Sequence, residues 1–82
     1  NLVARISPML ARELEETKLS AGQKIKPDGD WFRIEATVQD TWQLRWWLLS
    51  KAVDLTVLEP AELRSQIREH LNVAMEAYRT EV

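Results

Sequence analysis

Three segments of the chain alternate between apolar and polar residues, a period of two that is typical of half-buried β-strands. They span residues 2–6, 31–38 and 54–58. A shorter extended piece is expected at 23–26. The Pro-Asp-Gly-Asp sequence at 27–30 predicts a turn, because proline fixes φ and glycine accepts positive φ. The strands on either side of this turn are therefore expected to form a β-hairpin.

Three other segments repeat their apolar residues at spacings of three and four, which predicts helices. The first helix begins at Ser7-Pro8, where serine is a favoured N-cap and proline fits the first turn, and it ends near Thr17 or Lys18. The second helix takes Asp40 or Thr41 as its N-cap. The third helix has the longest apolar stripe, formed by Leu63, Ile67, Leu71, Ala74 and Tyr78.

The predicted order of elements is β-α-β-β-α-β-α, and its first six elements match a split βαβ arrangement. The fold class is therefore α+β: a ferredoxin-like βαββαβ unit with a four-stranded antiparallel sheet, two helices on one face, and an extra C-terminal helix. Residues 1–82 are expected to form a single domain. The chain starts at Asn1 directly in an apolar alternation, and we expect it to be a fragment of a longer protein.

Composition excludes several kinds of chemistry. The chain has no cysteine and one histidine, His70, so neither a thiolate zinc site nor a catalytic triad is predicted. Only two glycines are present, and no glycine-rich phosphate loop is formed. We expect no catalytic residue, no metal, no cofactor and no enzymatic activity. No apolar run is long enough to span a membrane, and the cytoplasm is the expected compartment.

The strand faces that point away from the helices carry the candidate binding residues. These are Arg5, Lys24, Lys26, Trp31 and Arg33, followed on the last strand by Thr56 and Leu58. Cations contact phosphates and an exposed indole can stack on a base, so this face is a candidate site for single-stranded nucleic acid. Two alternatives stay open: Glu35 opposes these charges and the face is simply solvated, or another domain covers it.

Three tryptophans lie on the predicted second helix. Trp47 shares the apolar stripe and is expected in the core, whereas Trp46 lies about 100° around the helix and Trp42 lies one turn earlier. At least one of Trp42 and Trp46 is expected to be partly exposed, which makes them candidate residues of an interface with another domain or subunit. The alternative is that both pack sideways under a neighbouring loop.

The chain resembles a known module in the segments 47–50 (WLLS), 54–60 (DLTVLEP) and 63–64 (LR), and in Tyr78. These segments look like the C-terminal extension, or WCX domain, of WYL-domain transcriptional regulators. Gln23 and the Asp28-Gly29 pair also fit the hairpin of that family. Two residues depart from the pattern. Ala52 stands where the family usually has a glycine, which would cost about 1 kcal/mol if the backbone there is left-handed. Trp46 stands where a polar residue is expected.

The resemblance implies a ferredoxin-like domain that follows a winged helix-turn-helix and a WYL domain in a bacterial DNA-binding regulator. It also implies contributions to homodimer contacts and to the response to an effector, which is single-stranded DNA in some members. The expected partners are therefore the WYL and helix-turn-helix domains of the parent chain, a second copy of the parent, and single-stranded nucleic acid.

Two other functions occur on related topologies. A stand-alone ferredoxin-like domain that senses a small molecule has the same topology, and stabilisation by a metabolite would distinguish it. An acylphosphatase-like hydrolase needs a phosphate-binding loop after the first strand, where this sequence begins a helix at Ser7-Pro8. The first therefore remains the alternative, and the second is disfavoured.

Overall fold

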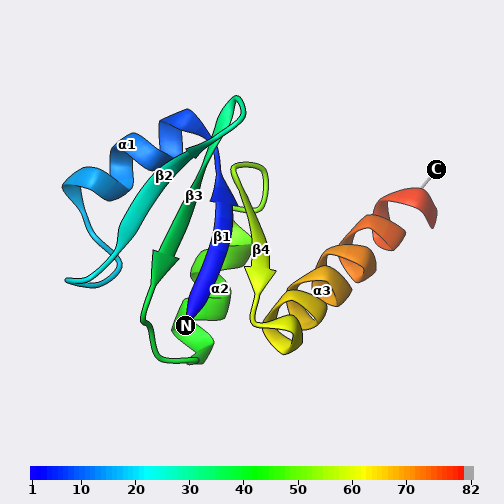
Figure 1. Cartoon of the computed structure of the whole chain (residues 1–82). Coiled ribbons are helices and arrows are strands. Elements are labelled where there is room, and N and C mark those ends of the chain that lie inside the picture. Colours follow the sequence, from blue (N-terminus) through cyan, green and yellow to red (C-terminus); the bar gives the residue numbers. More distant parts are fainter. Residues whose placement is uncertain (81–82) are drawn as a thin grey trace.

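The computed structural model describes residues 1–80 and contains four strands and three helices (Figure 1). In chain order these are β1 (Leu2–Ile6), α1 (Pro8–Glu16), β2 (Lys24–Asp28), β3 (Trp31–Ala36), α2 (Trp42–Ser50), β4 (Leu55–Glu59) and α3 (Ala61–Thr80). This order confirms the predicted succession of elements. No helix within the described residues is both long enough and apolar enough to cross a membrane.

The four strands form one sheet in the order β2-β3-β1-β4, and every neighbouring pair is antiparallel. The first strand is therefore central, although it begins the chain, and the second lies at an edge. This arrangement, with α1 and α2 on the same face of the sheet, is consistent with a ferredoxin-like fold (Figure 1). The predicted fold class is confirmed, including the additional C-terminal helix α3.

The hairpin between β2 and β3 is tighter than predicted. Strand β2 runs through Pro27 to Asp28, and only Gly29 and Asp30 form the turn. Proline is tolerated here because β2 is an edge strand, where a missing N–H need not break a ladder hydrogen bond. Gly29 has φ +66°, as the first central residue of a type II′ hairpin turn requires. At its other end β3 stops at Ala36, two residues earlier than predicted.

Side-chain caps begin the first two helices. The Ser7 hydroxyl accepts a hydrogen bond from the Leu10 N–H at 3.2 Å, and Pro8 occupies the first turn as predicted. Thr41 caps α2 in the same way, through a 3.2 Å bond from the Leu44 N–H. Of the two predicted caps for this helix, Thr41 is therefore the one used, and Asp40 is free for another role.

The end of α2 settles the question raised by the alanine at position 52. The helix ends at Ser50 and is capped by Lys51, whose backbone has φ −105°, and no residue other than glycine has positive φ within residues 1–80. The backbone therefore does not adopt the left-handed shape that favours glycine. Ala52 carries no strain from this source, because its helix ends by a different geometry.

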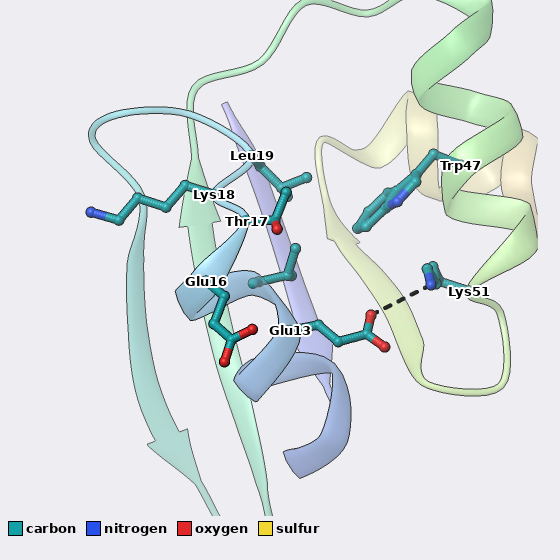
Figure 2. A pocket seen from close by; sticks show the side chains of 8 residues that line it. Glu13, Glu16, Thr17, Lys18, Leu19, Trp47 and Lys51 are labelled. Carbon is teal, nitrogen blue, oxygen red and sulfur yellow. Dashed lines mark ion pairs between the residues drawn. The ribbon is translucent and has the colours of Figure 1, made fainter.

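The core lies between the sheet and the helices α1, α2 and the first half of α3. The strands contribute Leu2, Ala4, Ile6, Ile34, Leu55 and Val57. The helices contribute Leu10, Ala11, Leu14, Leu48, Leu63 and Ile67. Trp47 packs against this cluster but stays partly exposed, where its ring faces the end of α1 (Figure 2). An ion pair of 3.5 Å between Glu13 on α1 and Lys51 at the end of α2 lies beside it.

Helix α3 is packed in its first half only. Leu63 and Ile67 are buried against the core, but Leu71 is 40% exposed and Tyr78 is 71% exposed. Figure 1 shows the reason: the helix leaves the sheet beyond β4 and projects away from the rest of the domain. The predicted helix is confirmed, but only the first half of its apolar stripe contributes to the core.

Candidate nucleic-acid interface

The register of the sheet brings three of the predicted basic residues together. Arg33 on β3 lies opposite Lys26 on one side and opposite Arg5 on the other. Arg5 in turn lies opposite Thr56 on β4. Directly opposed residues share a face, and neighbouring strands are about 4.8 Å apart, so these side chains form a line across the sheet. We call Lys26, Arg33 and Arg5 the basic row, and the face that carries them, away from α1 and α2, the open face.

Trp31 lies next to this row at the hairpin end of β3. Its ring is partly exposed, and the Arg5 guanidinium carbon is 5.2 Å from the ring centroid, a cation–π distance. The indole is thus already held by one cation in the absence of a ligand. A base that stacks on this ring has a guanidinium as its neighbour, an arrangement that single-strand binding surfaces use.

An acidic residue, Asp28, partly neutralises the positive charge of the open face. Asp28 lies opposite Trp31, and its carboxylate forms ion pairs with Arg5 at 3.5 Å and with Arg33 at 3.8 Å. The Arg5 guanidinium also donates to the Asp28 carbonyl oxygen at 3.4 Å. The side chains of this trio are 37–49% exposed, so their ion pairs are solvated and contribute little to stability. Asp28 nevertheless orients both arginines and neutralises part of their charge.

The sequence contains a pattern that places Asp28 on the open face, but the predicted turn at 27–30 hid it. Lys24, Lys26 and Asp28 continue one alternation, and they share the open face if the strand runs through position 27. Placing the proline in the turn removed Asp28 from that face. The edge position of β2, which permits proline in the strand, follows from the sheet order and not from the local sequence.

The fifth predicted residue, Lys24, lies apart from the basic row. It is opposite Glu35 on β3, which in turn is opposite Val3 on β1. A register shift in the β1–β4 pair places Glu59, and not Leu58, opposite Val3. Leu58 was expected on the open face, but the shift interrupts the alternation of β4 there and leaves Leu58 without a partner residue on β1. This end of the open face carries Lys24 with two glutamates, whereas the hairpin end carries the basic row.

The two interface tryptophans lie on a different part of the molecule. Trp42 and Trp46 are 67% and 64% exposed, so the prediction that at least one is exposed is confirmed for both. They do not reach the open face. Instead they line a groove of about 240 Å³ between α2 and α3, which we call the α2–α3 groove, together with Leu49 and Ile67.

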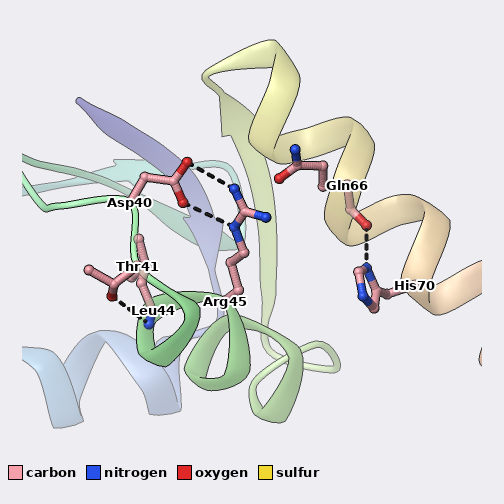
Figure 3. A network of polar contacts seen from close by, with 6 residues as sticks. All are labelled: Asp40, Thr41, Leu44, Arg45, Gln66 and His70. Carbon is pink, nitrogen blue, oxygen red and sulfur yellow. Dashed lines mark hydrogen bonds and ion pairs between the residues drawn. The ribbon is translucent and has the colours of Figure 1, made fainter.

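A polar network borders the α2–α3 groove (Figure 3). Arg45 donates two hydrogen bonds of 3.0 Å to the carboxylate of Asp40. These hydrogen bonds, with a smaller coulombic contribution, hold the pKa of Asp40 below its ordinary value and raise the pKa of Arg45. On α3 the His70 ring donates from Nδ1 to the Gln66 carbonyl oxygen at 2.8 Å, because that carbonyl can only accept.

The His70 side chain is exposed, and its ring is hydrogen-bonded to its own helix. Within residues 1–80 the structure contains no group of three or more histidine, aspartate or glutamate side chains placed to hold a metal ion.

The fold and surface define the class first: a ferredoxin-like α+β domain with an additional helix and a charged open sheet face. Within that class, the chain belongs to the WCX domain family, whose model matches residues 1–75. This match covers all four strands and most of α3, and it confirms the resemblance seen in the sequence. Neither a curated protein nor a solved structure matches the chain.

Proposed function

We propose that this chain is the regulatory C-terminal domain of a WYL-domain transcriptional regulator, and that it helps the parent protein bind a single-stranded nucleic-acid effector. The observation that carries the proposal is the WCX family match over residues 1–75. In this proposal the domain acts by binding and assembly in the cytoplasm of a bacterium, not by catalysis, and operator DNA is read by the helix-turn-helix of the parent protein.

The basic row supports a phosphate-binding role for the open face. Lys26, Arg33 and Arg5 lie side by side on three strands, so a backbone that crosses the sheet there can contact several cations in succession. Trp31 supplies a ring beside them for stacking. An incoming phosphate competes with Asp28 for the two arginines, so binding is expected to be moderate and strongly dependent on salt.

The two exposed tryptophans support an assembly role at a separate place. Trp42 and Trp46 form one wall of the α2–α3 groove, and large exposed indoles of this kind are common in interfaces between domains or subunits. We assign this surface to contacts with the remainder of the parent regulator or with its second subunit. Because the groove and the open face are distinct, assembly and effector binding can occur together.

The binding part of the proposal is tested by amide NMR spectra of the 82-residue chain during titration with an oligothymidylate. We expect shifts at Arg5, Lys26, Trp31 and Arg33 that reverse when salt is raised, because phosphate contacts displace counterions. Shifts at Lys24 are expected to be smaller, since Glu35 lies opposite it. Shifts confined to α1 or α2 would contradict the site.

The regulatory part is tested in the parent protein. Its gene is expected to encode a helix-turn-helix and a WYL domain before this segment, and finding neither would contradict the proposal. In the full regulator, Trp46→Ser is expected to weaken assembly without changing oligonucleotide binding by the isolated domain. Arg33→Glu is expected to have the opposite pattern, because the two residues lie on separate surfaces.

A further inference from the structure

A second groove lies where the edge strand β4 meets helix α3. Its volume is about 240 Å³, and we call it the β4–α3 groove. Its polar lining comes from Thr56, Arg64, Arg68 and Asn72, with apolar walls from Val57 and Ile67. Two cations and two neutral hydrogen-bonding side chains thus face this groove, and no carboxylate lines it.

The two arginines of this groove differ from the arginines of the open face and of α2, which are bound by carboxylates. Arg5 and Arg33 share Asp28, and Arg45 is bound to Asp40. Among the residues that the structure describes, neither Arg64 nor Arg68 forms an ion pair. Their charges therefore remain available to an anion that enters the groove.

Arg64 is also held in place before any ligand arrives. Its Nη1 donates to the Val57 carbonyl oxygen on β4 at 2.9 Å, which fixes the guanidinium against the edge of the sheet. Arg68 follows four residues later, one turn along α3, so both side chains point toward the same side of the helix. A guanidinium that is already ordered loses less entropy when it binds a phosphate.

The acidic residues of α3 point in other directions around the helix than the two arginines. Glu62, Glu69 and Glu76 recur every seven residues, and at 100° per residue they lie about 80–160° around the axis from Arg64 and Arg68. The helix thus separates its charges around its axis. The lining of the β4–α3 groove therefore carries two positive charges and no negative one, although the net charge of the chain is −2.

The basic row leads directly to this groove. The row ends at Arg5, whose opposite residue on β4 is Thr56, and Thr56 also lines the groove. We infer that the β4–α3 groove is a second phosphate-binding subsite, in which Arg64 and Arg68 bind the backbone of a single-stranded nucleic acid that continues across the sheet from the basic row. This inference rests on the proposed function and extends its site from β2 to α3.

The test compares two exposed arginines that take no part in an ion pair in the described structure, Arg68 in the groove and Arg12 on α1, on the covered side of the sheet. Oligothymidylate binding is measured by fluorescence anisotropy over a series of salt concentrations for Arg68→Gln and for Arg12→Gln. Both changes remove one positive charge. We expect Arg68→Gln to weaken binding about threefold to tenfold and to reduce the slope of log K against log salt by about 0.7.

For Arg12→Gln we expect an unchanged slope, because no phosphate is near α1. Equal effects of the two variants would overturn the second subsite, since the charge of the whole chain would then explain both. The variant Arg33→Gln separates this result from the proposed function. If it weakens binding while Arg68→Gln does not, the sheet site stands and the groove fails; if the wild-type chain does not bind, both fail.

Two other anions, compared with the oligonucleotide, identify which kind of anion the groove binds. Amide shifts at Arg64, Arg68 and Thr56 are recorded with inorganic pyrophosphate, with a poly-glutamate peptide and with the oligonucleotide. We expect the oligonucleotide to saturate these shifts at a concentration at least tenfold lower than either competitor, because it also contacts the basic row. Saturation by pyrophosphate or by the peptide at the same concentration would overturn a nucleic-acid subsite.

Discussion

The two faces of the sheet differ in what their side chains do: one face is buried in the core, and the other presents charged residues to solvent. On the covered face, Ile34 is fully buried and packs with strand and helix residues of one cluster. On the open face its neighbour Arg33 is half exposed and is held only by a weak ion pair with Asp28. The covered face contributes the stability of the domain, whereas the open face can change its charges at little cost. Stability and binding are therefore separable residue by residue.

The largest expected effect comes from the covered face. Ile34→Ala removes a fully buried side chain and leaves a cavity, which is expected to lower the free energy of unfolding by about 2–5 kcal/mol. The matched change next to it, Arg33→Ala, is expected to alter stability by no more than about 0.5 kcal/mol. Urea denaturation of both variants measures the difference. Similar losses would contradict the separation of the two faces.

The hairpin that carries Asp28 and Trp31 gives the next effect. Gly29→Ala forces a residue with a Cβ into φ +66°, at an expected cost of about 1 kcal/mol. Gly22→Ala is the matched control, because its added Cβ would meet no atom within 4 Å and its φ is not positive. Thermal denaturation should show a lower Tm for the first variant only. An unchanged Tm for Gly29→Ala would indicate that the turn relaxes to another shape.

A change of charge on the open face should affect binding without affecting stability. Asp28→Asn frees Arg5 and Arg33 from their shared carboxylate, so we expect oligonucleotide binding to become about threefold to tenfold tighter at low salt. The free energy of unfolding should change by less than about 0.5 kcal/mol, because the ion pairs are exposed. Anisotropy and urea denaturation measure the two quantities. Weaker binding would mean that Asp28 orders the arginines more than it competes for them.

The smallest effect concerns the exposed pair of Asp40 and Arg45. Because Arg45 donates to the carboxylate, the pKa of Asp40 is expected below its ordinary value of 3.8. A depressed pKa stabilises the folded state above the unfolded pKa, and this contribution is lost as pH falls through the folded value. NMR titration of the Asp40 carboxyl measures the shift. Arg45→Gln should return the midpoint toward 3.8, and an unchanged midpoint would contradict the assigned cause.

The apolar pattern predicted the fold well because burial follows periodicity. Leu2, Ala4 and Ile6 alternate in the sequence and are all buried in the structure, and the Ser7-Pro8 pair begins a helix as expected. The family match then confirmed the resemblance that the segment 47–64 had indicated. These features depend on a residue and its near neighbours, so they can be read from the chain directly.

The open face was harder to predict because its charges depend on register and on edges. Asp28 joins the face only when proline is allowed in an edge strand, and Glu59 joins it through a register shift next to Val3. The second half of α3 has the same spacing as its first half, yet it projects past the sheet, as Tyr78 shows. A stripe predicts an amphipathic helix, but it cannot indicate how far the partner surface extends.

The β4–α3 groove could not be predicted for a related reason. The Leu63-Arg64 pair belongs to the resemblance, but its sequence does not indicate that Arg64 reaches back to the Val57 carbonyl. Arg68 reads as one more solvated cation on a helix. Their relation to the basic row appears only when the strand order places β4 next to β1 and the helix beyond it.

The central claim is that the open face binds the phosphate backbone of a single-stranded nucleic acid. Its most direct test compares two double charge reversals by the fluorescence anisotropy of one oligothymidylate. Lys26→Glu with Arg33→Glu alters the basic row, and Arg12→Glu with Lys18→Glu changes the net charge equally on α1 and its following loop. We predict that the first pair lowers affinity at least about tenfold more than the second at low salt. Equal losses would contradict the claim, because binding would then follow the charge of the whole chain and not the basic row.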